Sequence, residues 1–172
     1  NYSSLWGLNT PSFSSGAAYG DLDNDGDLDL IVNNVNMPPF IYRNETGGKL
    51  NANYLTVSLK CEGYNTAAIG ANITLYHNEK LFYQELIPAR GFQSSVDNRL
   101  HFGLGEINSI DSMIVNWPDG KCTIFRDLAV NQFLTLEEKN TSDTCMKAKI
   151  NDYSPVFQKI EKIDGLDFTH KE

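Results

Sequence analysis

Five aspartates stand on alternate positions of the stretch GDLDNDGDLDL, residues 20–30: Asp21, Asp23, Asp25, Asp27 and Asp29. Carboxylates this close repel one another unless a cation lies between them. Counted from the first aspartate, acidic residues occupy positions one, three, five and nine, and Gly26 at position six permits a sharp turn. This spacing is typical of a loop that wraps a hard cation in oxygen ligands. The aspartates at those four positions are expected to supply carboxylate oxygens, and Asp27 its main-chain oxygen.

Calcium suits this set of ligands better than other metals do. The donors are numerous, flexible and all oxygen, which favours calcium over magnesium. Transition metals would require histidine or cysteine, and neither occurs nearby in the sequence. The loop is not an EF-hand, because position twelve is Val32 in place of glutamate and the flanking segments GAAY and DLIVNN are typical of strands. The alternative interpretation is a solvated acidic turn that binds no ion.

Short β-strands are the elements expected to position this loop, and no segment is a convincing helix. Residues 53–63 alternate apolar and polar side chains with the period of two that is typical of a half-buried strand. Runs of the same kind follow at residues 71–87, 99–105, 113–125 and 132–138. The runs at residues 71–87 and 113–125 carry turn residues in the middle, which predicts two β-hairpins. The sequence therefore predicts an all-β chain with an antiparallel β-sandwich or barrel over residues 51–139.

The charge of the chain is concentrated in the aspartate stretch. The 172 residues have a formal net charge of -8, so the chain without these five aspartates carries about -3. We do not expect nucleic acid as a partner, because the sequence contains no cluster of lysine and arginine. Membrane insertion is not expected either, because no apolar run approaches the roughly 20 residues that a membrane span requires.

The three cysteines, Cys61, Cys122 and Cys145, do not follow a C-x-x-C spacing. This argues against a zinc site and against a scaffold rich in disulfides. We expect Cys61 and Cys122 to be small, unpaired strand residues, and the alternative is that one pair of the three forms a disulfide.

The N-terminal part, residues 1–50, contains a recognisable repeat. The segment SSGAAYGDLDNDGDLDLIVNNVNMPPFIYRNE, residues 14–45, resembles the FG-GAP or VCBS repeat through D-x-D-x-D-G-x-x-D, an asparagine-rich turn and an aromatic strand. The resemblance implies a blade-like β-hairpin unit with bound Ca²⁺. The calcium ligands that it implies are Asp21, Asp23, Asp25, Asp27 and Asp29.

The middle of the chain, residues 51–139, resembles the ASPIC/UnbV domain. The motifs that carry the resemblance are IGANITLY, RGFQSS, LHFGLGE, VNWPDGK and NQFLTLEE, in the order of the family. Residues 140–172 begin with a polar segment that is typical of a linker and end with GLDFTHKE, which is similar to the start of a further repeat. We therefore expect the chain to be a fragment of a longer, secreted protein with several repeats.

The three histidines give no sign of an enzyme. His77 falls in a predicted turn, His101 in a predicted strand and His170 in the C-terminal tail. None adjoins a nucleophile signature such as G-x-S-x-G. Glutamates could supply a carboxylate pair, but nothing in the sequence places two of them across a cleft. We expect no enzymatic activity and interpret His101 as a structural histidine.

The resemblance to the two families implies a non-catalytic extracellular module for interaction, adhesion or scaffolding, secreted or on a bacterial cell surface. Its expected partner is an extracellular protein or a glycan. The alternative is a calcium-dependent carbohydrate-binding module of a glycan-handling surface protein, because aromatic rings stack on sugars. The aromatic candidates are Trp6, Tyr64, Tyr76, Tyr83, Phe92, Phe102 and Trp117, of which Trp117 is expected in the core. Arg90 and Phe92 are the candidate ligand-binding residues, and the other interpretation of their segment is a tight corner between strands.

Overall fold

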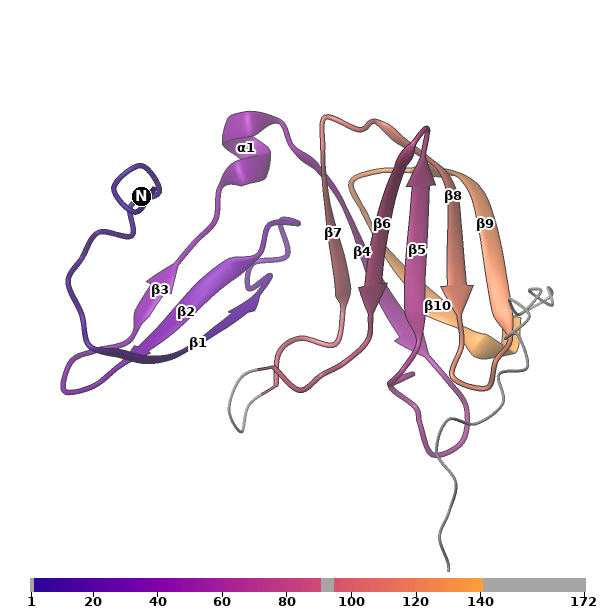
Figure 1. The fold of residues 1–172 in the computed structure, drawn as a ribbon, viewed down its shortest axis with the longest axis horizontal. Coiled ribbons are helices and arrows are strands. Elements are labelled where there is room, and N and C mark those ends of the chain that lie inside the picture. Colours follow the sequence, from indigo (N-terminus) through magenta and orange to yellow (C-terminus); the bar gives the residue numbers. More distant parts are fainter. Residues whose placement is uncertain (1, 91–94, 141–172) are drawn as a thin grey trace, which may run out of the picture.

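The structure is a computed structural model that describes residues 2–90 and 95–140. It contains a small β-sheet at the N-terminal end and a β-sandwich beside it (Figure 1). The expectation of an all-β chain is confirmed. The expected linker and further repeat lie outside the described residues from residue 141 onward, as do Phe92, Cys145 and His170. Neither helix in the described residues is long and apolar enough to cross a membrane.

The small sheet has three antiparallel strands in the order β1-β2-β3. These are β1 (Ser14–Gly20), β2 (Asp29–Asn34) and β3 (Phe40–Tyr42). Gly20 pairs with Asp29 at one end of the sheet, so the residues between them must turn back on themselves. The aspartate stretch is therefore the loop of a β-hairpin, and its two flanks are strands as predicted.

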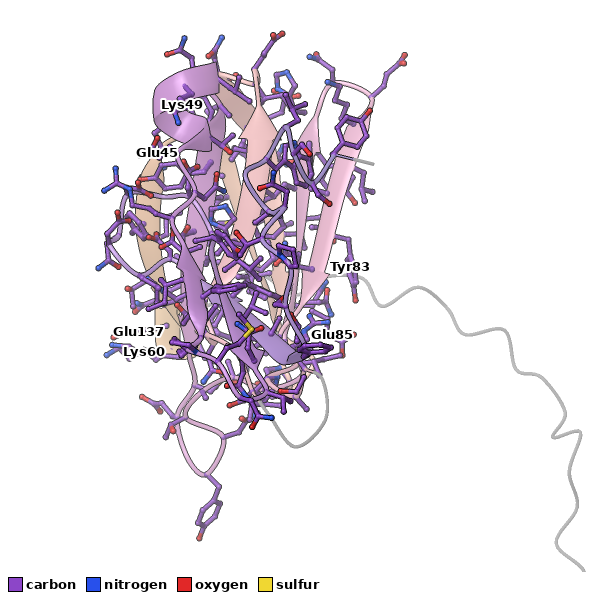
Figure 2. The ribbon with its side chains drawn as sticks, turned by 90° about the vertical axis from the view of Figure 1, so that its left-hand side faces the viewer. Glu45, Lys49, Lys60, Tyr83, Glu85 and Glu137 are labelled. Atoms are coloured by element: carbon purple, nitrogen blue, oxygen red, sulfur yellow. The ribbon has the colours of Figure 1, made fainter. Side chains whose placement is uncertain are left out.

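A short helix, α1 (Thr46–Leu50), connects the small sheet to the sandwich, and a 3-10 helix, Glu138–Asn140, follows the last strand. No helical pattern predicts α1, since five residues are too few to display a helical period. An ion pair of 2.6 Å between Glu45 and Lys49 supports α1 on its exposed side (Figure 2). Asn51 ends the helix in the left-handed conformation, with φ of 49°. Residue 51, where we expect the boundary between the two units, lies between α1 and the first strand of the sandwich, and the division itself stays a prediction.

The sandwich consists of two sheets built from seven strands. They are β4 (Asn53–Lys60), β5 (Asn72–His77), β6 (Lys80–Glu85), β7 (Leu100–Gly105), β8 (Ser109–Asn116), β9 (Cys122–Ala129) and β10 (Gln132–Glu137). One sheet has the order β10-β4-β7 and the other β6-β5-β8-β9. The two predicted hairpins are confirmed as β5–β6 and β8–β9. The architecture is a sandwich and not a closed barrel.

One strand pairing differs from the antiparallel expectation. Strand β10 runs parallel to β4, and this register places Glu137 opposite Lys60. The two residues lie side by side at the C-terminal ends of their strands (Figure 2). The difference arises because β10 follows β9 of the other sheet, so the chain crosses over to reach β4. Alternating side chains predict a strand but do not predict its direction relative to its neighbour.

Apolar side chains from the inner faces of both sheets form the core of the sandwich. They include Leu55, Val57, Ile73, Leu75, Phe102, Met113 and Val115. Trp117, which follows β8, is 3% exposed, so its predicted place in the core is confirmed. Its indole Nε1–H donates a hydrogen bond of 2.9 Å to the Oγ1 of the buried Thr123. The buried indole N–H therefore has the partner that it requires.

The Trp117→Phe variant is expected to lower the free energy of unfolding by about 1–2 kcal/mol, because it leaves the Thr123 hydroxyl buried without this donor. Equilibrium unfolding in urea measures the change. The double variant with Thr123→Val removes both polar partners and should recover part of the loss. Unfolding of Trp117→Phe at the wild-type midpoint would contradict this account of the pair.

Candidate metal centre

Three of the five aspartates bring their carboxylates together in the loop between β1 and β2. One carboxylate oxygen from each of Asp21, Asp23 and Asp29 lies within 4.8 Å of the others. Asp21 is 5% exposed and Asp29 is 2% exposed, whereas Asp23 is open to solvent. Two buried carboxylates beside a third require a compensating positive charge. The only ion pair that they make among the described residues joins Asp23 to the exposed Arg43, at 3.7 Å.

Backbone N–H groups hold the two buried carboxylates in place. Asp21 accepts hydrogen bonds of 3.2 Å from the amides of Asp25 and Gly26. Asp29 accepts from the amides of Leu22, at 2.9 Å, and Asn44, at 2.8 Å. The loop thus wraps around its own first and last aspartates. It also ties the start of β2 to the segment that follows β3.

The remaining two aspartates direct carboxylate oxygens to the backbone. Asp25 Oδ1 accepts a 3.0 Å hydrogen bond from the Asp27 amide, and Asp27 Oδ2 accepts one of 2.6 Å from the Gly47 amide. The Asp27 carboxylate therefore links the loop to α1. The main-chain oxygen of Asp27 is the atom that we expect to contribute to a metal site. The assignment of all five aspartates as ligands stays a prediction.

The donor chemistry of this cluster fits a calcium ion. Its carboxylates are hard oxygen ligands and lie on a loop that can adjust to a large ion. Neither histidine nor cysteine belongs to the cluster, so its composition does not favour a transition metal. Asp21, Asp23 and Asp29 would hold the ion through their side chains, which would offset the repulsion between them.

Two residues of the sandwich, Tyr54 and Arg99, complete the surroundings of the loop, and the sequence patterns did not reveal them. The ring of Tyr54 covers Gly26, where an added Cβ would lie closer than 3.0 Å to three ring atoms. Arg99 donates hydrogen bonds to the Asn24 side chain and the Asp21 main-chain oxygen. Burial and then the charges of the loop aspartates raise the pKa of Tyr54. The loop therefore lies against the sandwich.

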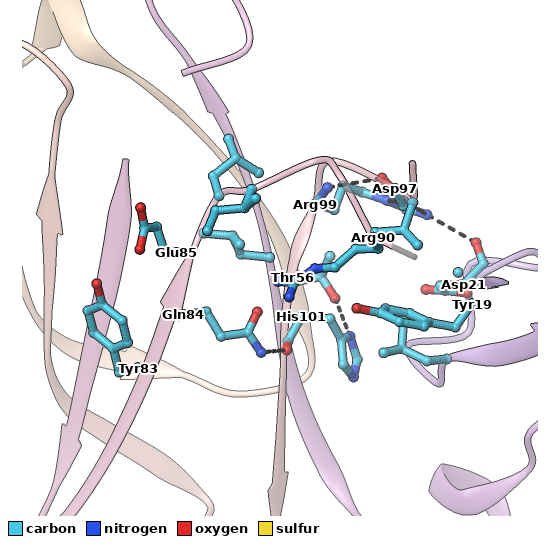
Figure 3. A pocket seen from close by; sticks show the side chains of 16 residues that line it. Tyr19, Asp21, Thr56, Tyr83, Gln84, Glu85, Arg90, Asp97, Arg99 and His101 are labelled. Atoms are coloured by element: carbon cyan, nitrogen blue, oxygen red, sulfur yellow. Dashed lines mark hydrogen bonds and ion pairs between the residues drawn. The ribbon is translucent and has the colours of Figure 1, made fainter. Parts of the chain in front are cut away.

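A cleft of about 530 Å³ lies next to the metal centre, between the small sheet and the sandwich (Figure 3). Arg90, a predicted ligand-binding residue, lines it together with Tyr19 and Tyr83. Phe92, the other predicted ligand-binding residue, lies outside the described residues. The cleft has the size of an ordinary small-molecule site.

His101 lies at the inner wall of this cleft and fits the structural role expected for it. Its Nδ1 shares a 2.9 Å hydrogen bond with Oγ1 of Thr56, a residue that is 2% exposed. Burial lowers the pKa of His101, while the nearby charges of Asp21 and Asp27 act in the opposite direction. The ring also stacks on Tyr54, with 6.0 Å between the centroids.

The described aromatic residues considered for sugar stacking include buried and exposed rings and one half-buried ring, that of Tyr76 on β5. Phe102 and Trp117 belong to the core, which removes them as stacking candidates. Trp6, Tyr64 and Tyr83 are exposed by 70%, 110% and 54%. Of these three, only Tyr83 lines the cleft.

The cysteines differ from the expectation of two unpaired strand residues. Cys122 is disulfide-bonded, so the expectation is wrong for this residue, whereas Cys61 is a free thiol directly after β4. Three cysteines without a recognised spacing leave their pairing open at the level of sequence. Burial, followed by the hydrogen bond and charge of Glu138, raises the pKa of Cys61 to about 12. The Cys61 thiol is therefore protonated and unreactive at neutral pH.

Comparison with known proteins identifies the sandwich. The family model ASPIC and UnbV matches residues 62–143. Cartilage acidic protein 1 of Xenopus tropicalis is 31% identical over 141 residues, which cover 77% of this chain and 21% of that protein. The chain thus spans about a fifth of the length of this curated relative. Strand β4 precedes the matched segment and completes its sheet by pairing with β7 and β10. The chain carries an ASPIC and UnbV domain over residues 62–143.

Proposed function

We propose that the chain is a non-catalytic, calcium-binding interaction module of an extracellular protein, with a role in adhesion or scaffolding. The observation that carries the proposal is the convergence of the Asp21, Asp23 and Asp29 carboxylates within 4.8 Å of one another. In this proposal the unit of residues 1–50 is an FG-GAP or VCBS repeat. Calcium neutralises its aspartate loop and fixes the strands on either side.

The surroundings of the two described histidines support a non-catalytic role. His101 shares its hydrogen bond with the hydroxyl of Thr56, a residue that is only 2% exposed, so this hydroxyl is not presented to a substrate as an exposed nucleophile. His77 lies at the β5–β6 turn beside Asn78 and Asp111. Neither arrangement presents an exposed nucleophile next to a base, which is what nucleophilic catalysis requires.

An extracellular location agrees with two independent observations. The disulfide at Cys122 is of a kind that persists in oxidising compartments and is rare in the cytosol. The second observation is the 31% identity to cartilage acidic protein 1, whose name refers to cartilage. We propose that the module is secreted or displayed on a cell surface, where millimolar calcium suits an extracellular site.

Isothermal titration of the purified chain with calcium and with magnesium tests the proposal. We expect one calcium site that saturates at extracellular concentrations, and much weaker binding of magnesium, which demands a smaller octahedral cage. Asp23→Asn should abolish the calcium signal, because it removes one of the three converging carboxylates. Absence of calcium binding at millimolar concentration would overturn the proposed function.

A second candidate function, carbohydrate binding, is favoured by the cleft of about 530 Å³ beside the loop. The exposed ring of Tyr83 offers a stacking face, and Arg90 and Gln84 are polar lining residues. A glycan array with the calcium-loaded chain tests this function. We expect Tyr83→Ala to abolish any sugar binding and Tyr64→Ala, an exposed tyrosine outside the cleft, to leave it unchanged. Equal binding by both variants would exclude the cleft as a sugar site.

A further inference from the structure

The aspartate loop accepts hydrogen bonds from Arg99, an arginine of the sandwich. Arg99, directly before β7, donates one hydrogen bond of 2.8 Å from Nη1 to Oδ1 of Asn24. It donates another of 3.0 Å from Nη2 to the main-chain oxygen of Asp21. Asn24 has φ of 58°, so the arginine bonds the residue that carries the left-handed turn of the loop. The planar fork of a guanidinium holds both acceptors at once.

The guanidinium is itself held by residues of the sandwich. Asp97 accepts from Nε and forms an ion pair with Nη2, with both contacts at 2.6 Å. The guanidinium carbon lies 5.9 Å from the centre of the Phe133 ring. These contacts fix the direction of Arg99, and the Asp97 charge offsets its positive charge. An arginine can therefore stand beside a cation site without repelling the cation strongly.

Tyr54 forms the second contact between the sandwich and the loop. Its ring lies on Gly26 and packs edge-on against Phe133, with 5.5 Å between ring centroids. Its backbone is held on both sides by Asn131, through hydrogen bonds of 3.0 Å and 2.7 Å. Gly26 is buried as a result, although residues 22–25, which precede it in the loop, are exposed. The ring thus forms a rigid surface on which the loop rests.

We propose that the sandwich clamps the aspartate loop through Arg99 and Tyr54, so that the calcium affinity of the loop depends on residues that do not touch the ion. This inference rests on the proposed calcium function and adds the reason why one module contains both units. Arg99 is a positioning residue, because it fixes the turn at Asn24 and the main chain of the ligand Asp21. By reciprocity, calcium bound to the loop strengthens the docking of the small sheet on the sandwich.

Two opposite effects of Arg99 can be separated by experiment. If its charge were the dominant effect, Arg99→Gln would tighten calcium binding by removing a positive charge. If positioning dominates, both Arg99→Gln and Arg99→Lys weaken binding, since lysine keeps the charge but loses the fork. We expect a loss of about tenfold in calcium affinity for both variants, within the range of ordinary coupling between sites.

The experiment combines calcium titration with amide hydrogen exchange on the full chain. Wild type, Arg99→Lys and Arg99→Gln are compared with Arg126→Gln, an exposed arginine on β9 at the far side of the sandwich (Figure 1). Exchange is followed without calcium at the amides of Asp25 and Gly26, which donate to the Asp21 carboxylate. Both Arg99 variants should exchange faster at these amides than wild type and Arg126→Gln.

The two readouts distinguish failure of the clamp from failure of the calcium function. Faster loop exchange in the Arg99 variants together with weaker calcium binding supports the inference. Unchanged loop exchange, or tighter calcium binding by Arg99→Gln, overturns the clamp. If the wild-type chain binds no calcium while the variants still loosen the loop, the contact stands and the calcium function is overturned.

Discussion

Calcium at a thousandfold excess over its dissociation constant is expected to raise the melting temperature of the chain by roughly 10 °C relative to the same chain in chelator. Binding to the folded state alone at that excess contributes about 4 kcal/mol. For a chain of this size each kcal/mol corresponds to roughly 2–4 °C. The physical source is the repulsion between the Asp21, Asp23 and Asp29 carboxylates, which calcium relieves only when the loop is folded. Differential scanning calorimetry measures the shift.

Asp23→Asn is the variant that isolates this effect. Asp23 belongs to the cluster but is exposed, and its one described ion pair, with Arg43, is long. The variant should melt at or above the wild-type temperature in chelator, because it removes one of the three repelling charges, and it should show no further rise when calcium is added. Asp29→Asn, in contrast, should melt lower than the wild-type chain in chelator. The buried Asp29 accepts two backbone hydrogen bonds, and an amide oxygen can replace only one of the two acceptor atoms.

Asp127→Asn provides the matched control for the loss of one negative charge. Asp127 is exposed on β9, outside the loop, and its φ of 52° is tolerated by asparagine. Its calcium-dependent shift should equal that of the wild-type chain. A full calcium shift in Asp23→Asn would contradict a site at the Asp21, Asp23 and Asp29 cluster.

The features that could be predicted from the sequence are those that depend on residues close to one another along the chain. The hairpin loop follows from alternating aspartates and Gly26, which has φ of 92°. The two hairpins of the sandwich follow from strand alternation on either side of turn residues. Trp117 could be placed in the core because it adjoins a strand and a turn. In each case the signal lies within about ten residues of the feature.

The parts that the sequence did not predict are contacts between distant segments. Arg99 bonds to Asn24 across 75 residues, and no local pattern marks an arginine for that role. The parallel pairing of β10 with β4 likewise joins the last strand of the sandwich in the sequence to its first. Local periodicity states which face of a strand is buried but does not identify the strand beside it. The loop could therefore be recognised from sequence, whereas its dependence on the sandwich required the fold.

Gly26→Ala is expected to lower the free energy of unfolding by about 3 kcal/mol and to weaken calcium binding, because two costs coincide at this position. The added Cβ would lie closer than 3.0 Å to three atoms of the Tyr54 ring, so the ring or the loop must move. The left-handed backbone at Gly26 adds strain for any residue with a side chain. Urea unfolding and calcium titration of the variant measure the two effects.

Two further variants separate the clash from the backbone strain. Gly63→Ala carries a similar φ of 78° in a loop with nothing within 4 Å of the new Cβ, so it should show only the strain, about 1 kcal/mol. The double variant Gly26→Ala with Tyr54→Ala makes room for the methyl group, so its loss of stability should be smaller than the sum of the two single losses. If Gly26→Ala costs no more than Gly63→Ala, the ring of Tyr54 does not press on the loop. If Gly26→Ala costs more than Gly63→Ala and calcium binding weakens in parallel, the contact between the Tyr54 ring and the loop contributes both to the stability of the fold and to the calcium affinity of the loop.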